Sequence, residues 1–152
     1  MENSNSRIIT KACLRICVID GQGGGIGSLI IRGLKQEYGE AVEILALGTN
    51  AIATSQMMKA NANWGATGEN AIITTVAQAD VVIGTISIIL ANAMMGEVTP
   101  AMATAVSSCQ ALKLLLPLNQ EQVEIITANH EPLPHQVEYL VKNRLKELLQ
   151  NV

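Results

Sequence analysis

Seven residues near the N-terminus have the composition of a phosphate seat: Gly21–Gly27 reads Gly-Gln-Gly-Gly-Gly-Ile-Gly, five glycines in seven positions. Glycine suits a backbone that turns sharply or approaches a ligand closely, because it carries no Cβ. Leu14–Ile19 before the loop has the apolar pattern of a buried strand, and Ile26–Tyr38 after it has helical spacing. The first N–H groups of such a helix attract an anion. The candidate cofactor-binding residues are therefore Gly21, Gln22, Gly23, Gly24, Gly25, Ile26 and Gly27.

The same loop departs from several known phosphate signatures. Ile26-Gly27-Ser28 stands where a P-loop would close with Lys-Ser or Lys-Thr, so an ATPase is not expected. Ile26 also replaces the last glycine of a strict dinucleotide fingerprint. Asp20, directly before the loop, would repel a pyrophosphate unless it binds a metal, a hydroxyl or a backbone amide. A turn that only lets strand and helix pack closely is the alternative interpretation.

Asp20 and Glu97 are the candidate catalytic residues. Glu97 is the only charged residue between Asp80 and Lys113. An isolated carboxylate in an apolar stretch tends to have a raised pKa when buried, and such groups cluster at functional sites. A small enzyme could use the two carboxylates as acid and base or as metal ligands. No catalytic triad or metal-ligand spacing supports a reaction class, so the sequence does not decide whether this protein is an enzyme.

Small polar residues follow two further predicted strands. In open α/β sheets, ligands bind beyond the carboxyl ends of the strands. Dinucleotide folds place an acid at the end of the second strand to hold ribose hydroxyls, but this chain has Thr49-Asn50 there. These two residues could bind a ribose or a phosphate, or they could cap the next helix. The cofactor is unknown, with NAD(P) or another nucleotide possible, and the added candidates are Thr49, Asn50, Gly84 and Thr85.

The elements that position these residues alternate between strands and helices. Strands are predicted over Leu14–Ile19, Val42–Leu47, Asp80–Thr85, Leu112–Leu118 and Val123–Thr127. Helices are predicted over Ile26–Tyr38, Ala51–Ala60, Glu69–Ala79, Pro100–Gln110 and Leu133–Leu149. Asn61–Gly68 is predicted as a loop that holds Trp64. The alternation predicts an α/β fold: a three-layer, Rossmann-like, mostly parallel sheet of about five strands.

The last two predicted strands are separated by only Asn119–Gln122. A parallel crossover needs about a dozen residues or more, so an antiparallel hairpin is expected at that edge.

The whole chain of 152 residues is long enough for one domain, predicted over 13–152 after a disordered or extended segment over 1–12. Its net charge is −3 and it has no basic stripe, so nucleic-acid binding is not expected. No apolar run reaches about 20 residues and no signal peptide is seen, so a cytoplasmic protein without a membrane span is expected. Cys13 and Cys17 are expected to be buried, reduced thiols, and no metal site is predicted.

Val81–Leu112 carries almost no charge and is rich in apolar residues. An exposed apolar helix face usually marks an interface, so a homo-oligomer formed through this region, most simply a C2 dimer, is expected. A non-catalytic regulatory or assembly subunit is therefore an alternative to a ligand-binding protein.

Four motifs carry a resemblance to a known family. They are Val18-Ile19-Asp20-Gly21-Gln22-Gly23-Gly24-Gly25-Ile26-Gly27, Leu47-Gly48-Thr49-Asn50, Ala66-Thr67-Gly68-Glu69-Asn70-Ala71 and Gly96-Glu97-Val98-Thr99-Pro100. Together they resemble a family of small, uncharacterised bacterial proteins classed as a domain of unknown function, over nearly all of the chain after Ala12. The resemblance implies a Rossmann-like fold and no established activity.

A more distant likeness, to NAD(P)-binding Rossmann domains, covers only the first strand, the glycine loop and the first helix. Short-chain dehydrogenases in that group also need a Tyr-x-x-x-Lys pair, whereas Tyr139 and Lys142 are spaced Tyr-x-x-Lys, so that chemistry is not supported. The leading hypothesis is a nucleotide- or dinucleotide-binding protein with Gly21–Gly27 as the phosphate seat.

Overall fold

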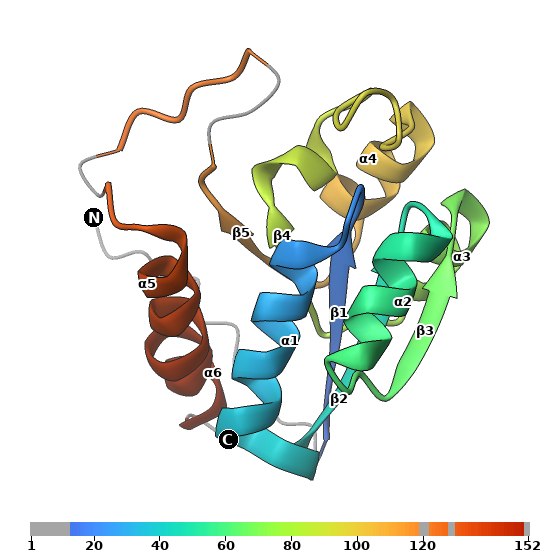
Figure 1. Ribbon diagram of the computed structural model, residues 1–152. Coiled ribbons are helices and arrows are strands. Elements are labelled where there is room, and N and C mark those ends of the chain that lie inside the picture. The colour runs from blue at the N-terminus through green and yellow to red at the C-terminus, as the bar shows by residue number, and fades with distance from the viewer. Residues whose placement is uncertain (1–12, 119–121, 128–129, 151–152) are drawn as a thin grey trace.

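The computed structural model describes residues 13–118, 122–127 and 130–150 (Figure 1). The strands are β1 Leu14–Asp20, β2 Val42–Gly48, β3 Trp64–Thr67, β4 Val81–Thr85 and β5 Leu112–Leu116. The α-helices are α1 Gly25–Tyr38, α2 Ala51–Lys59, α3 Glu69–Val76, α4 Pro100–Ser108, α5 Leu133–Glu138 and α6 Leu145–Gln150. Short 3₁₀ turns are η1 Gly39–Ala41 and η2 Ile86–Ile89, and a π-helical segment, η3 Tyr139–Arg144, joins α5 to α6. The segment 1–12, predicted to be disordered or extended, lies outside the described residues.

The sheet has the strand order β3-β2-β1-β4-β5, and every pair of neighbouring strands is parallel. The chain starts at the centre with β1, moves outward to β3, and then returns to the other side of β1 through β4. The strand order therefore reverses between β1 and β4, which is the position where open α/β sheets bind ligands. The predicted three-layer, Rossmann-like fold is confirmed.

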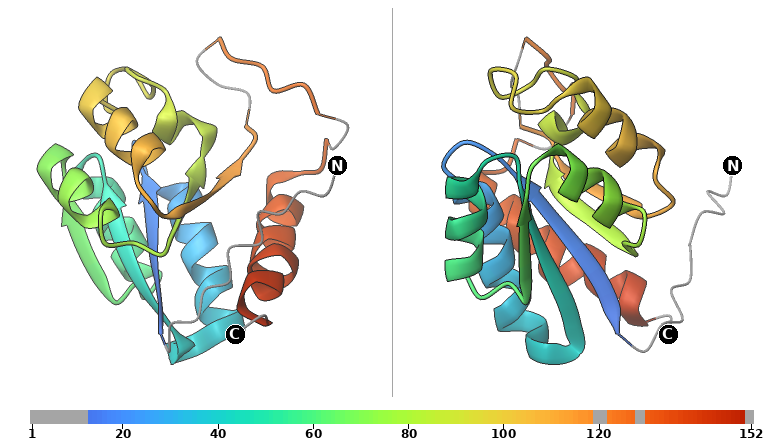
Figure 2. Two further views of the ribbon diagram at one scale, coloured as in Figure 1. Left: turned by 180° about the vertical axis from the view of Figure 1, so that it is seen from behind. Right: turned by 90° about the vertical axis from the view of Figure 1, so that its right-hand side faces the viewer.

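Helices cover both faces of the sheet (Figure 2). One face packs against α1, α2 and the C-terminal helix formed by α5, η3 and α6, and the opposite face packs against α3 and α4. Alternate β1 residues enter the two cores: Ile16 and Val18 on the first face, Cys17 and Ile19 on the second. A strand that is buried on both sides reads as a continuous apolar run, which is why β1 was evident from its sequence.

The prediction of a loop around Trp64 is wrong. Trp64–Thr67 forms the edge strand β3, with Trp64 beside Leu45 and Thr67 beside Gly48 of β2. This strand lacks an apolar pattern because it buries little: the Trp64 side chain is 64% exposed. Pairing with β2, rather than local preference, makes this segment a strand.

The predicted antiparallel hairpin is also wrong. Within the described residues the sheet ends at β5, which pairs in parallel with β4, and Val123–Thr127 forms no strand. Val123 makes only an isolated bridge and the Ile126 side chain is 88% exposed, so this segment adds no strand to the sheet. Much of the intervening Asn119–Gln122 lies outside the described residues.

The apolar tract Val81–Leu112 is largely buried within the chain itself. Its contributions to the core on the α3/α4 face are Val82, Ile88, Ala93, Met94, Val98, Met102, Ala103, Val106 and Ala111. The tract therefore does not need a partner to cover most of its apolar surface, and the homo-oligomer stays a prediction. In the described part of the chain, no helix has both the length and the apolar character needed to cross a membrane.

The two N-terminal cysteines differ in environment. Cys17 is fully buried in β1, and burial raises the pKa of its thiol to about 12. Cys13 is exposed, so the prediction that it is buried is wrong. The strand begins at Leu14, which leaves Cys13 beyond the covered part of the sheet.

Candidate functional site

Asp20 is the last residue of β1, and its side chain is hydrogen-bonded to both ends of the glycine loop. Its Oδ1 accepts a hydrogen bond from the Gly21 N–H at 2.8 Å, and its Oδ2 accepts one from the Gly27 N–H at 2.7 Å. Gly24, the N-cap of α1, has no side chain with which to cap the helix. The Asp20 carboxylate thus acts as the cap of α1 from the preceding strand, and backbone amides are the partners that a carboxylate at this position requires.

Burial governs the ionisation of Asp20, whose side chain is 5% exposed. Loss of solvent raises its pKa above the usual aspartate range, although the N–H groups of Gly27 and Gly21 oppose this by stabilising the charged form. The negative charge of Glu97 adds to the increase in pKa. Asp20 is thus a buried, structurally engaged carboxylate.

The five loop glycines fall into two groups. An added Cβ at Gly21 would lie 2.5 Å from Thr49 Oγ1, one at Gly24 would lie 2.8 Å from the Ala53 backbone, and one at Gly27 would lie 2.5 Å from Met57 Sδ. Close packing therefore requires glycine at these three positions, and Gly24 also has a φ of +73°.

Gly23 and Gly25 form the second group. An added Cβ at either position would meet no atom within 4 Å, and neither residue has a left-handed φ. The fold itself imposes no steric requirement for glycine at these two positions. The interpretation of the loop as a packing device alone therefore accounts for only part of it.

A cavity of about 260 Å³ lies on this loop, at the point where the strand order reverses between β1 and β4. It is lined by Asp20, Gly21, Gln22, Gly23, Gly24, Gly25, Ile26, Thr85, Met94 and Leu133. Thr85 ends β4 and is 2% exposed, and its hydroxyl has no hydrogen-bond partner in the described part of the chain. Buried hydroxyl groups are normally paired, and leaving one unpaired costs about 1–3 kcal/mol.

Close packing requires glycine at Gly84, which was predicted together with Thr85, and ligand binding by Gly84 stays a prediction. An added Cβ there would lie 2.8 Å from Ile88 Cδ1 and 2.9 Å from the Ile19 carbonyl oxygen.

Glu97 reaches the other side of the loop from the segment between β4 and α4. Its Oε1 accepts three hydrogen bonds: from the Gln22 N–H at 2.9 Å, from Thr49 Oγ1 at 2.8 Å and from Asn50 Nδ2 at 2.6 Å. Partial burial acts to raise the pKa of Glu97, but the three donors outweigh it and hold the pKa below the usual glutamate range. Glu97 therefore carries a negative charge at neutral pH, in contact with two loops of the site.

Asn50 has the capping role that was one of its two predicted functions. Its Oδ1 accepts a hydrogen bond from the Ala53 N–H at 2.8 Å, at the start of α2. Its Nδ2 also donates to the Gln22 carbonyl oxygen at 3.0 Å. The Thr49 hydroxyl and the Asn50 amide both donate hydrogen bonds to Glu97. Ligand binding by these two residues stays a prediction.

The two carboxylates predicted to be catalytic lie near each other. They accept hydrogen bonds from the consecutive amides of Gly21 and Gln22, so their oxygens are within about 10 Å of one another. Both Asp20 oxygens are bound by backbone N–H groups, and a catalytic role for either residue stays a prediction. In the ranges that the structure describes, no three His, Cys, Asp or Glu side chains form a group that could hold a metal ion.

Comparison with known families agrees with the resemblance seen in the sequence. A family model described as a domain of unknown function, DUF3842, matches residues 15–149. The chain belongs to the DUF3842 family. No curated protein and no solved structure matches it. The DUF3842 match spans the glycine loop, Thr85 and both carboxylates, while the more distant link to NAD(P)-binding domains stays a prediction.

Two residues that line the cavity on the glycine loop were not identified from the sequence. These are Met94 and Leu133, and nothing in the local pattern distinguishes either residue from other apolar residues of the chain. Leu133 reaches the cavity because the chain after β5 returns to the N-terminal end of α1, which is a property of the tertiary structure.

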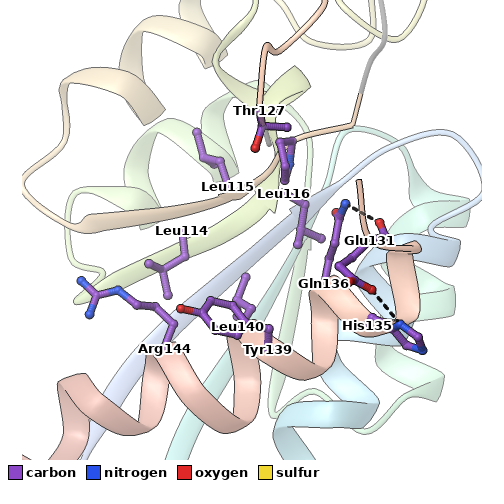
Figure 3. A pocket seen from close by; sticks show the side chains of 11 residues that line it. Leu114, Leu115, Leu116, Thr127, Glu131, His135, Gln136, Tyr139, Leu140 and Arg144 are labelled. Atoms are coloured by element: carbon purple, nitrogen blue, oxygen red, sulfur yellow. Dashed lines mark hydrogen bonds and ion pairs between the residues drawn. The ribbon is translucent and has the colours of Figure 1, made fainter. Parts of the chain in front are cut away.

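A second cavity, of about 540 Å³, lies between β5 and the C-terminal helix (Figure 3). Leucines 114–116 form its apolar side, and Tyr139, Leu140 and Arg144 come from the helix. Its charged groups are paired, because His135 Nδ1 lies 3.0 Å from Glu131 Oε2 and Arg144 lies 3.1 Å from Glu147. The sequence did not point to this cavity.

Proposed function

We propose that this protein binds a small, nucleotide-like ligand through a phosphate that rests on the glycine loop, in the cavity between β1 and β4. The observation that supports the proposal best is that Gly23 and Gly25 are glycines although the fold leaves open space beside both. Glycine is required there if a ligand approaches the backbone closely.

Three hydrogen-bond donors support an anionic ligand group at this position. In the described residues, the N–H groups of Gly23 and Gly25 have no backbone acceptor, and the Thr85 hydroxyl has no partner. The N-terminus of α1 adds the partial positive charge of the helix dipole, about half an elementary charge. A phosphate oxygen would pair these donors, while the two oxygens of Asp20 stay bound to Gly21 and Gly27.

Met94 and Leu133 give the same cavity two apolar lining groups. A ligand site of this type combines apolar walls with a few placed polar groups. The organic part of the ligand would lie between these two side chains.

The test is a Gly25→Val substitution measured against a panel of inorganic phosphate, AMP, ATP, NAD, NADP, FAD and S-adenosylmethionine, with and without magnesium. We expect at least one phosphate-bearing compound to raise the melting temperature of the wild type, because a ligand at 100 times its Kd adds about 2.7 kcal/mol of stability. Gly25→Val places a side chain in the open space beside the loop, so we expect that gain to disappear while the unliganded variant still unfolds cooperatively.

Gly33→Ala is the matched control on the same helix. Its Cβ would make an ordinary contact of 3.4 Å with Val141 Cγ2, and Gly33 does not line the cavity. We expect unchanged ligand binding and a small gain in stability, about 0.5–1 kcal/mol. Undiminished binding to Gly25→Val, or no binding of any phosphate compound to the wild type, would contradict the proposal.

A cytoplasmic location and a homo-oligomeric state remain part of the proposal. All three cysteines are free, which agrees with a reducing compartment.

A further inference from the structure

Dinucleotide folds bind the adenosine ribose at the end of the second strand, a position that we call the β2 half-site. We infer that Glu97 fills the β2 half-site of this protein. The ligand is then a compact phosphate monoester and not a dinucleotide. The inference rests on the proposed function for the phosphate seat. It adds the chemical class of the ligand and names the residue that sets it.

The hydrogen-bond donors at the end of β2 are already bound to Glu97. Thr49 Oγ1 and Asn50 Nδ2 both donate to Glu97 Oε1, at 2.8 and 2.6 Å, and Gln22 adds its backbone N–H at 2.9 Å. In a dinucleotide fold a carboxylate at this position binds ribose hydroxyls. Here the carboxylate comes from a different segment, 48 residues after Thr49, and binds the protein's own hydroxyl and amide groups.

The segment that carries Glu97 lies directly on the loop. An added Cβ at Gly21 would be 2.6 Å from Met94 Sδ and 3.2 Å from Glu97 Oε1. Even a methyl group does not fit between Gly21 and this segment. A ribose has no space on that side of the loop while the segment keeps this position.

This closing segment, Asn92–Val98, is itself well structured. The Asn92 N–H donates to the Val98 carbonyl oxygen at 2.7 Å, and the Gly96 N–H donates to the Asn92 carbonyl oxygen at 3.1 Å. Next to it, the Thr99 hydroxyl donates to Glu69 Oε1 of α3 at 2.6 Å. The closing segment is therefore held by hydrogen bonds within itself and by the Thr99–Glu69 contact next to its C-terminal end, and none of these involves a ligand.

Charge and size favour the same ligand class. The negative charge of Glu97 disfavours a second phosphate at the end of β2, such as the 2′-phosphate of NADP. The cavity that remains, about 260 Å³, is smaller than the roughly 300–1,000 Å³ of sites for drug-sized ligands. It accommodates one phosphate and a compact organic group between Met94 and Leu133.

The experiment compares phenyl phosphate with ADP-ribose and NADP by isothermal titration calorimetry. For the wild type we expect phenyl phosphate to bind and the other two to bind at least about tenfold more weakly. Glu97→Ala removes the carboxylate and frees its three donors, so we expect ADP-ribose to bind at least about tenfold more tightly than to the wild type. Phenyl phosphate is titrated with the same variant, and the result is read as the ratio of ADP-ribose affinity to phenyl phosphate affinity, which we expect to rise at least about tenfold over that of the wild type.

Glu97→Gln is the matched control, since its amide oxygen still accepts from the same donors and keeps the half-site filled. We expect it to exclude ADP-ribose as the wild type does. Admission of ADP-ribose by Glu97→Gln would show that charge alone excludes it, and would overturn the closure.

Wild-type binding of ADP-ribose as tight as that of phenyl phosphate would also overturn the closure, and this comparison does not depend on any variant folding. If Gly25→Val still abolished phenyl phosphate binding in that case, the phosphate seat would stand and only the closure would fail. If phenyl phosphate did not bind to the wild type, the inference would fail, and the phosphate seat would fail with it only if no other phosphate compound of the panel bound either.

Discussion

At the scale of single residues, Asp20 and Glu97 are two carboxylates with similar partners and opposite pKa shifts. Both accept backbone N–H groups of the glycine loop. Asp20 is almost fully buried, so the loss of water outweighs its hydrogen bonds and raises its pKa. Glu97 is only half-buried and gains two side-chain donors, so its pKa falls. Burial, rather than the number of donors, separates the two residues.

Replacement of Asp20 tests its role as a fastener of the loop. The Asp20 carboxylate accepts one hydrogen bond from Gly21 and one from Gly27. In Asp20→Asn one carboxylate oxygen becomes an NH₂ group, so one of these bonds is lost and the NH₂ group faces a backbone N–H. We expect the free energy of unfolding, measured by urea denaturation at neutral pH, to fall by about 1–3 kcal/mol.

The same pair of proteins should differ in pH dependence. Because the folded pKa of Asp20 is raised, the unfolded chain loses this proton first as the pH rises above about 4. The Asp20 contribution to stability therefore decreases as the pH rises through the folded pKa. Asp20→Asn lacks this contribution, and Glu97 titrates in both proteins. Parallel stability curves across the acid range would contradict the buried, raised-pKa state of Asp20.

At the scale of elements, neighbouring glycines in the turn from β1 to α1 differ in whether the fold requires glycine. Gly24 has a left-handed φ and lies against the backbone of α2, whereas Gly23 has open space beside it. The loop can therefore be divided by experiment into positions that the fold requires and positions that it tolerates.

Gly24→Ala and Gly23→Ala form the test of that division. We expect Gly24→Ala to lower the free energy of unfolding by at least about 2 kcal/mol, from the left-handed φ and the 2.8 Å approach to Ala53 together. Gly23→Ala should change it by less than about 0.5 kcal/mol. Chemical denaturation of both variants checks this, and equal losses would show that the two positions are not distinct.

At the scale of the whole molecule, the first and the last helix that the structure describes share one core. The C-terminal helix packs its buried residues Val137, Val141 and Leu145 on the same face of the sheet as α1. Helix α1, which follows the glycine loop, thus packs against the last helix that the structure describes. Leu133, at the start of that last helix, also lines the cavity.

Leu145→Ala tests this dependence. Leu145 is fully buried, so we expect a loss of about 2–5 kcal/mol in the free energy of unfolding. Lys146→Ala, at the exposed neighbouring position, is the control and should change stability by less than about 0.5 kcal/mol. A small effect of Leu145→Ala in equilibrium denaturation would show that the helix adds little to the core.

The elements that were predicted correctly are those whose signals lie within a short stretch of sequence. The apolar run of β1, the glycine loop and the helical spacing of α1 were predicted together. Helix α4 begins at Pro100 as predicted, and Thr99 Oγ1 caps it by accepting a hydrogen bond from the Met102 N–H. These features depend on residues a few positions apart, so the physics that forms them is present in a short stretch of chain.

Features that depend on distant partners could not be predicted and follow from the way the chain folds. Trp64–Thr67 is a strand because β2 offers it an edge, and Val123–Thr127 is not one although its residues suit a strand. Glu97 meets Thr49 and Asn50 because the chain returns across the top of the sheet, and Thr85 joins the loop because β4 lies beside β1. Such contacts form between segments far apart in the chain, and no local pattern of residue types encodes which segments will meet.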